Sequence, residues 1–154
     1  MFCSHYPSPV GRLTLVGDGP ILTGLYLEKN CPAVLPPEGF APVFPQTCNW
    51  LDLYFQGIAA PPDFCLAPQG TPFQQEVWNI LRTVPFGRTL TYGTVAQMLG
   101  RPMSPQAVGG AVGRNPISII IPCHRIIGSH GRLTGYAGGL EAKQWLLHHE
   151  GVIL

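Results

Sequence analysis

The sequence predicts an α+β protein with a small sheet-containing N-terminal domain and a mainly helical C-terminal domain. Strand-like apolar runs with a turn signal between them occur near the start of the chain. Helical patterns with capping signals begin near residue 71, after a proline-rich stretch. We therefore expect an N-terminal scaffold domain over residues 1–66, a linker over 67–70 and a second domain over 71–154.

A β-hairpin is the first element expected. Residues 13–16 and 21–27 are strand-like, and residues 17–20 between them read Gly-Asp-Gly-Pro, which is a turn signal. Five prolines predict a loop over residues 31–46. A short helix is expected over residues 49–56, and it would present three large apolar side chains: Leu51, Tyr54 and Phe55.

The C-terminal domain is expected to open with a helix. Residues 71–74 read Thr-Pro-Phe-Gln, a capping box with proline at the first helical position. The apolar positions of this segment fall on one helical face: Phe73, Val77, Ile80, Leu81 and Val84. Short helices are expected next over residues 92–99 and 105–113, the second with Ser104 as N-cap. Two such helices joined by a tight turn predict a helix-turn-helix.

A buried strand and a last helix complete the expected fold. The run Ile119-Ile120-Ile121 favours a core strand, and Pro122 would end it because proline has no N–H for the ladder. A glycine-rich stretch follows. The final helix is expected over residues 140–150, with Gly151 at its C-terminal cap.

The charge distribution permits a polyanionic partner without requiring one. The whole chain has a net charge of +1, whereas residues 1–70 carry −3 and residues 71–154 carry +4. Six of the seven cations in the second part are arginines. An arginine-rich half is compatible with nucleic-acid binding, although +4 is ordinary for a domain of this size.

Composition also argues against several classes of protein. No apolar run reaches the roughly 18 residues of a membrane span, and the N-terminus lacks the pattern of a signal peptide. Five cysteines without a CxxC pair favour reduced thiols, so we expect a cytoplasmic protein without disulfides. We expect no cofactor and no membrane partner. A metal site is not expected either, because the candidate zinc ligands match no structural zinc spacing: Cys3, His5, Cys31, Cys48 and Cys65.

Cys123 and His124 are the strongest candidates for chemistry. The thiolate reacts rather than the thiol, so a nucleophilic cysteine needs a nearby base or positive charge, and His124 directly follows Cys123. The alternative is that Cys123 is a small core side chain, as most free cysteines are. Adjacent side chains of a strand point to opposite faces, so adjacency alone leaves both interpretations open.

The helix expected over residues 105–113 is unusual because it contains three glycines. Each glycine in a helix costs about 1 kcal/mol relative to alanine. Close packing against another helix would explain Gly109, Gly110 and Gly113. A bare backbone that lets another molecule approach would explain them equally well.

Several C-terminal segments together resemble the O6-alkylguanine-DNA alkyltransferases. The matching segments are residues 71–78, Thr91-Tyr92-Gly93, Ala107-Val108-Gly109, residues 115–125, residues 135–139 and residues 145–151. The similarity covers roughly residues 70–152, and Pro-Cys-His-Arg at 122–125 is its most specific part. Residues 1–65 resemble the family's variable N-terminal domain only in length and strand content. The resemblance implies a ribonuclease-H-like N-terminal domain, a winged helix-turn-helix-type C-terminal domain and the bacterial single-function form.

The resemblance implies direct reversal of DNA damage with a protein cysteine as the acceptor. Cys123 would attack the alkyl carbon on guanine O6 and keep the alkyl group, so that each molecule acts once. His124 would deprotonate Cys123 through a water molecule, while Glu150 orients and polarises His124. Tyr92 resembles the tyrosine that donates a proton to the departing guanine, and Asn115 resembles the residue that holds the turn around Cys123.

The implied partner is double-stranded DNA that contains O6-alkylguanine, bound by a monomer. The damaged nucleotide is flipped out of the duplex, and the glycine-containing helix enters the minor groove. The substrate- and DNA-binding positions implied in this way are Gln106, Ala107, Gly109, Gly110, Arg114, Ser118, Tyr136, Gly138 and Gly139. Ser118, Gly138 and Gly139 would line the pocket, and Tyr136 would pack on the alkyl group.

One position departs from the family pattern. Gln106 stands where an arginine usually fills the gap left by the flipped base, and Pro105 beside it is also unusual. Gln106 can occupy space and hydrogen-bond to the orphaned cytosine, but it brings no charge. Either flipping is weaker or Arg101 or Arg114 compensates, and the sequence does not decide between these. Arg125 is expected to form an ion pair with the N-terminal domain.

Three alternatives belong to other functional classes. A sensor that binds alkylated DNA without repair requires Gln106 to have abolished productive flipping. A helix-turn-helix regulator leaves Cys123 and Glu150 unexplained. A Cys-His-Glu hydrolase turns over many times and needs an oxyanion hole, of which the sequence shows no clear sign. Without the resemblance, Glu150 would be interpreted as a surface carboxylate, because its charge opposes the dipole at a helix C-terminus.

Overall fold

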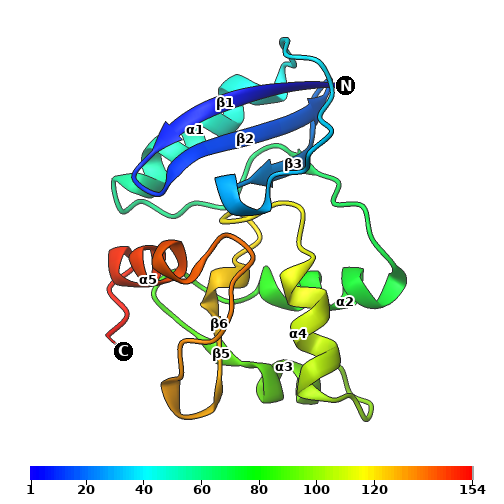
Figure 1. The fold of residues 1–154 in the computed structure, drawn as a ribbon, viewed down its shortest axis with the longest axis vertical. Helices are drawn as coiled ribbons and strands as arrows, with labels where there is room; N and C mark the ends of the chain where they lie inside the picture. Colours follow the sequence, from blue (N-terminus) through cyan, green and yellow to red (C-terminus); the bar gives the residue numbers. More distant parts are fainter. Residues whose placement is uncertain (154) are drawn as a thin grey trace.

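The computed structural model describes residues 1–153 and confirms the α+β class. Figure 1 shows the N-terminal sheet and α1 at one end of the molecule and the C-terminal helices at the other. The elements in chain order are β1 (Phe2–Ser8), β2 (Gly11–Asp18), β3 (Ile21–Tyr26), the 3-10 helix η1 (Glu28–Asn30), α1 (Val43–Phe55), β4 (Cys65–Leu66), α2 (Pro72–Leu81), β5 (Leu90–Thr91), α3 (Tyr92–Met98), α4 (Pro105–Gly113), η2 (Cys123–Arg125), β6 (Ile126–Ile127), η3 (Ser129–Gly131) and α5 (Leu140–His149).

The N-terminal sheet has the strand order β1-β2-β3-β4. The predicted hairpin is confirmed: β2 and β3 pair antiparallel, and Asp18 faces Ile21 across the turn. The sequence did not predict β1, which pairs antiparallel with β2 along its whole length. The short β4 adds to β3 in parallel, and the helix α1 packs against β2 and β3. This arrangement leaves β1 as one edge of the sheet.

Helix α1 corrects the prediction in this region. A loop was expected over residues 31–46 and a helix over 49–56, but the helix runs from Val43 to Phe55. Pro45 lies in the first helical turn, where backbone N–H groups have no intrahelical acceptor, so proline is tolerated there. The prolines therefore lie in the loop before the helix and in its first turn, and they do not exclude a helix from this region. Tyr54 is fully buried, as its predicted place on the inner face requires.

The capping signals of the C-terminal helices are confirmed. Thr71 Oγ1 accepts a hydrogen bond from Gln74 N at 3.2 Å, and Gln74 Oε1 accepts one from Thr71 N at 3.0 Å. Ser104 Oγ accepts from Ala107 N at 3.1 Å at the start of α4. Gly151 follows α5 with a φ of 82°, a conformation that glycine adopts without strain. The local sequence therefore defines where these helices begin and end.

The predicted strand over residues 119–121 is wrong. These residues form turns, and Ile119 has a φ of 71°, which is unusual for a β-branched side chain. The apolar run does indicate burial, but burial does not require a strand when other groups satisfy the backbone. The sequence also did not predict β6, which directly follows η2 and pairs in parallel with β5.

The turn before Cys123 is attached to the N-terminal sheet through β3. Leu25 N donates to Pro116 O at 2.9 Å, and Ser118 N donates to Leu25 O at 2.9 Å. These two bonds form an isolated parallel bridge between Leu25 and Ile117. The sheet therefore supports the segment that leads to Cys123, although the two lie far apart in sequence.

One hydrophobic core extends through both parts of the chain. It includes Leu25 and Tyr54 from the N-terminal part and Val77, Ile117 and Leu146 from the C-terminal part. Within residues 1–153, no helix is long and apolar enough to cross a lipid bilayer.

Candidate active site

The segment before Cys123 is held by one buried side chain, that of Asn115. Its amide nitrogen donates to Ile121 O at 2.8 Å and to Ile117 O at 3.3 Å. Its amide oxygen accepts from Ile117 N at 3.0 Å. Asn115 therefore closes the turn by supplying bonds that a strand ladder would otherwise provide. The 3-10 helix η2 follows and places Cys123, His124 and Arg125 in succession, all of them buried.

His124, the residue after Cys123 in the chain, pairs with a buried carboxylate. Its Nε2 lies 2.6 Å from Glu150 Oε2, and both side chains are fully buried. Because an ionised carboxylate only accepts hydrogen bonds, Nε2 carries the proton and Nδ1 has a free lone pair. Nδ1 is buried and has no hydrogen-bond partner among residues 1–153. An imidazole in this state is equipped to accept a proton.

The Glu150 carboxylate accepts hydrogen bonds from four residues. Oε2 accepts from His124 and from Tyr54 Oη at 2.6 Å, and from an Arg125 Nη at 3.0 Å. Oε1 accepts from Arg125 Nε at 2.8 Å and from Gly87 N at 3.1 Å. Burial raises the pKa of Glu150, but the hydrogen bonds and charges of His124 and Arg125 outweigh it and hold the pKa well below its usual range. Glu150 therefore remains charged.

Arg125 forms an ion pair, but not with the N-terminal domain as expected. Its guanidinium binds Glu150 on α5 and donates to Val84 O at 2.7 Å, and it lies 5.9 Å from the centre of the Phe86 ring. All three partners belong to the C-terminal part of the chain. The N-terminal domain reaches this cluster instead through Tyr54, a residue that the sequence did not single out for chemistry.

At rest the cysteine and the histidine are both neutral. Burial raises the pKa of the Cys123 thiol, and the polar groups of Asn115 and Tyr136 and the charge of Lys143 oppose this only in part. Burial lowers the pKa of His124, and the hydrogen bond and charge of Glu150 offset it in part. Two successive residues therefore hold a neutral thiol and a neutral imidazole that can act as a base.

A cavity of about 450 Å³ opens beside Cys123. Its walls are Tyr92, Pro105, Gln106, Gly109, Val112, Gly113, Asn115, Ser118, Cys123, Thr134, Gly135, Tyr136 and Ala137. The Tyr92 hydroxyl accepts a hydrogen bond from Thr134 Oγ1 at 3.3 Å. The cavity thus brings Tyr92 and the glycine-containing helix α4 to the same side of Cys123, whereas His124 and Glu150 lie buried behind it.

Gly138 and Gly139 lie outside this cavity, contrary to their expected place in its lining. A Cβ at Gly138 would lie 2.8 Å from a Leu27 methyl carbon and from the Tyr136 ring. Gly139 has a φ of 99° and packs against Lys29. Both glycines line a separate hollow of about 310 Å³ against the N-terminal domain. The physical reason for glycine here is close approach between the two parts of the chain.

The outer face of α4 carries the remaining predicted DNA-binding residues. Ala107, Gly110 and Arg114 are exposed and do not line the cavity. A Cβ added at Gly110 or Gly113 would meet nothing within 4 Å. Packing within the chain therefore does not explain these two glycines. Gly110 lies on the exposed face of the helix, whereas Gly113 also lines the cavity.

Arg101, one of the two cations considered as a substitute for the charge that Gln106 lacks, forms an exposed ion pair. Its guanidinium donates to both carboxylate oxygens of Glu76 on α2, at 2.7 and 3.1 Å. Arg114 is exposed at the C-terminal cap of α4 and forms no salt bridge within the described residues. Gln106 itself lies at the cavity wall. Arg114 therefore differs from Arg101 in having no acidic partner within the described residues.

Lys143 is a buried site residue that sequence reasoning missed. Its Nζ donates to Ile126 O at 2.6 Å and to Thr134 O at 3.2 Å, and so ties the segment that forms one cavity wall to α5. Burial lowers the pKa of Lys143 to about 8, and only the thiolate form of Cys123 opposes the shift. Because burial lowers its pKa, Lys143 loses its positive charge at a lower pH than an exposed lysine does.

The helical spacing of α5 indicates from the sequence that Lys143 and Glu150 are buried. On α5 and its cap, the buried positions are Lys143, Leu146, Leu147 and Glu150. This is the i, i+3, i+4, i+7 pattern of an inward face, so two charged residues share the apolar stripe. Charged side chains at such positions are buried only when they are paired, which marks them as candidates for a site. Within the described residues, no cluster of three or more potential ligands is placed to hold a metal ion.

Comparisons with known proteins identify the family. The family model for the DNA-binding domain of 6-O-methylguanine DNA methyltransferase matches residues 72–152. A methylated-DNA–protein-cysteine methyltransferase of Haemophilus influenzae is 44% identical over 99% of this chain and 87% of its own length. One of Methanosarcina acetivorans is 42% identical over 98% of this chain and 99% of its own.

A solved structure agrees with these matches. The crystal structure of Mycobacterium tuberculosis OGT in complex with DNA superposes with a TM-score of 0.89 and 44% sequence identity. The match covers 97% of this chain and 92% of the other. Since the family model spans more than half of the chain and the relatives match almost all of it, the chain belongs to the methylated-DNA–protein-cysteine methyltransferase family.

Proposed function

We propose that this chain repairs O6-alkylguanine in duplex DNA by transferring the alkyl group irreversibly to Cys123. The observation that carries the proposal is the position of Cys123, at the wall of an open cavity and next to a buried His124–Glu150 pair. The name shared by the relatives supports the reaction class. The sulfur that accepts the alkyl group is not regenerated, so each molecule acts once.

Activation of Cys123 begins with a proton transfer. A water molecule bridges the thiol and the buried Nδ1 of His124, because Nε2 is already engaged with Glu150. The thiol proton passes through this water to Nδ1 and leaves a thiolate. The resulting imidazolium is stabilised by the charged Glu150. Lys143 adds a positive charge that favours the thiolate.

Alkyl transfer then breaks one bond and forms another. The Cys123 sulfur attacks the alkyl carbon, the bond from that carbon to guanine O6 breaks, and its electron pair leaves with guanine. Tyr92 on the cavity wall donates a proton to the departing base, because a guanine anion is a poor leaving group. The tyrosine recovers a proton from solvent or from the imidazolium. The products are an S-alkyl cysteine and an unmodified guanine.

The DNA side of the reaction uses α4. We place this helix in the minor groove, where the exposed backbone at Gly110 permits close approach, with Ala107 and Arg114 at the duplex. The damaged nucleotide flips into the cavity, where Ser118 and Tyr136 contact it. Gln106 at the cavity wall fills the space that the base leaves.

Finer features of the architecture belong to the same proposal. The three antiparallel strands, α1 and the parallel β4 are compatible with a ribonuclease-H-like N-terminal domain over residues 1–66. Residues 67–70 would act as a linker, and α3 and α4 would form a winged helix-turn-helix-type unit within residues 71–154. We propose a monomeric protein of the cytoplasm or nucleoid that needs no cofactor.

Peptide mass spectrometry tests the proposed function. The protein is mixed with a duplex that contains one O6-methylguanine, and trypsin then releases residues 115–125, in which Cys123 is the only cysteine. We expect one methyl group on this peptide and saturation at one per protein molecule. Cys123→Ala should bind the same duplex without being methylated. Binding of the duplex by the parent protein without methylation would instead indicate a sensor.

A further inference from the structure

The carboxylate behind the active-site histidine receives a hydrogen bond from the N-terminal domain. Tyr54 on α1 donates its hydroxyl to Glu150 Oε2 at 2.6 Å. The same oxygen lies 2.6 Å from His124 Nε2, so the phenol and the imidazole share one acceptor atom. Tyr54 and His124 are both fully buried. The contact joins residues 96 positions apart in sequence.

The phenol is held in place from several sides. The Tyr54 ring stacks on Trp50 at 5.5 Å between ring centres and meets the edge of Phe86 at 5.8 Å. His149 lies 5.2 Å away and bonds to the Tyr54 carbonyl oxygen at 2.8 Å. Burial and the charge of Glu150 raise the pKa of Tyr54 well above its usual value. The hydroxyl therefore remains a protonated donor at any working pH.

We propose that Tyr54 is a positioning residue of the active site, which acts through Glu150 to set the basicity of His124. The inference rests on the proposed function, because it assigns a task to the His124–Glu150 pair. A donor on Oε2 withdraws negative charge from the oxygen that polarises the imidazole. The N-terminal domain thereby takes part in the chemistry and is more than a scaffold.

The other charged and titratable groups around the pair remain in place when the hydroxyl is removed. Arg125 on η2 binds both carboxylate oxygens, and Gly87 N binds Oε1 from the loop after α2. Lys143 on α5 lowers the pKa of His124. Among the described residues, Cys123 and Tyr136 line the cavity, and His149 contacts the Tyr54 ring. The substitution Tyr54→Phe therefore changes one donor and keeps the aromatic ring.

The sign of the effect follows from the shared acceptor. Without the phenol proton, Oε2 carries more negative charge and binds the His124 N–H more strongly. A stronger acceptor stabilises the imidazolium and raises the pKa of His124. The base must be neutral to accept the thiol proton, so the acid limb of the rate–pH profile moves to higher pH. We expect a shift of about 0.5–1 pH unit, with transfer on the acid limb roughly 3- to 10-fold slower and the alkaline plateau maintained.

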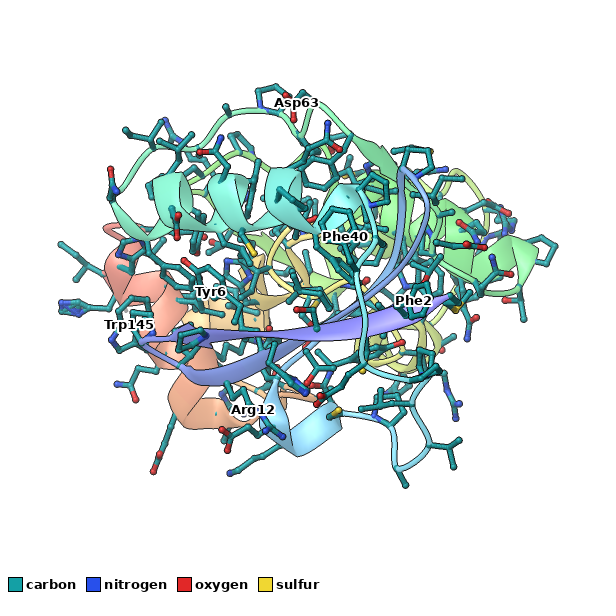
Figure 2. All side chains as sticks on the ribbon, turned by 90° about the horizontal axis from the view of Figure 1, so that it is seen from above. Phe2, Tyr6, Arg12, Phe40, Asp63 and Trp145 are labelled. Carbon is teal, nitrogen blue, oxygen red and sulfur yellow. The ribbon has the colours of Figure 1, made fainter. Side chains whose placement is uncertain are left out.

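The experiment measures methyl transfer to the 115–125 peptide under single-turnover conditions, with saturating duplex, across the pH range. The parent protein is compared with Tyr54→Phe and with the control Tyr6→Phe. Tyr6 lies on the same domain, and its hydroxyl donates to the exposed Asp52 at 2.5 Å. Figure 2 shows Tyr6 and Trp145 near the same end of β1, away from Phe2. Tyr6→Phe should leave the profile unchanged.

Thermal unfolding of the same variants separates positioning from packing. A purely structural role for Tyr54 predicts a lower unfolding temperature with an unmoved acid limb, and this result would overturn the inference. A second variant tests the route of the effect. In a Glu150→Gln background, Tyr54→Phe should no longer shift the limb, and a persistent shift would mean that Tyr54 acts elsewhere. If the parent protein transfers no methyl group at all, the proposed function fails and not merely the role of Tyr54.

Discussion

Glu150→Gln is the most informative single change, because the structure surrounds this side chain with donors only. Both carboxylate oxygens accept hydrogen bonds: Oε2 accepts three and Oε1 accepts two. An amide offers one acceptor oxygen and one donor nitrogen, so either orientation sets an NH₂ against other donors. The variant also leaves Arg125 buried without a partner charge.

The expected loss of stability is large for one isosteric substitution. Breaking a buried pair by removing one partner typically costs roughly 3–5 kcal/mol. For a chain of this size, each kcal/mol shifts the unfolding temperature by about 2–4 °C, so a decrease of roughly 6–20 °C is expected. Methyl transfer should also slow, since His124 loses the charge that stabilises its protonated form.

Thermal unfolding at several pH values tests this reasoning. The pKa of Glu150 is depressed in the folded protein, so its contribution to stability is present above the unfolded value, about 4.3, and is lost as pH falls toward the folded value. The gap between parent and variant should therefore narrow below about pH 4. Glu76→Gln breaks the exposed pair with Arg101 and is the control, with little expected change. A gap of less than about 2 °C at neutral pH would refute the account.

Three further substitutions probe other parts of the site. Gly110→Ala should raise the free energy of unfolding by about 1 kcal/mol through helix propensity and yet weaken duplex affinity; unchanged affinity would remove α4 from the interface. Gln106→Arg should tighten duplex binding or speed repair, and a slower variant in stopped-flow transfer assays would mean that the local geometry is built around glutamine. Lys143→Met should slow methyl transfer, because the cavity wall loses its tie to α5. The folded pKa of Lys143 is about 8 and the unfolded value is about 10.4, so the stability of the parent should rise relative to Lys143→Met as pH increases between them; a constant difference would contradict this.

The helices of the C-terminal part were predictable because their signals are local. Capping by Thr71 and Ser104 depends on residues three positions away, and the structure reproduces both caps. The turn at residues 119–121 was not predictable in this way. Its backbone is satisfied by the Asn115 side chain and by Leu25, a partner far away in sequence. An apolar run reports burial, and burial alone does not distinguish a strand from a buried turn.

The same distinction applies to the candidate site. The family motif led directly to Cys123, and the structure places His124 and Glu150 behind it. Tyr54 was assigned only to the apolar face of a helix, because a hydrogen bond to a residue 96 positions away leaves no trace in local spacing. Lys143 does have a local signal, its position on the inward stripe of α5. This signal is found only when charged residues are also considered as members of the buried face of a helix.

The bridge between Leu25 and the segment before Cys123 has a consequence for hydrogen exchange. The amides of Leu25 and Ser118 are each protected by an acceptor in the other part of the chain, at 2.9 Å. Neither bond opens unless β3 and the turn that precedes Cys123 separate, so the two amides should show closely similar free energies of opening, as members of one cooperative unit. Local opening of the turn before Cys123 therefore requires β3 of the N-terminal domain to move as well. The free energy of this opening depends on the contacts between the two domains.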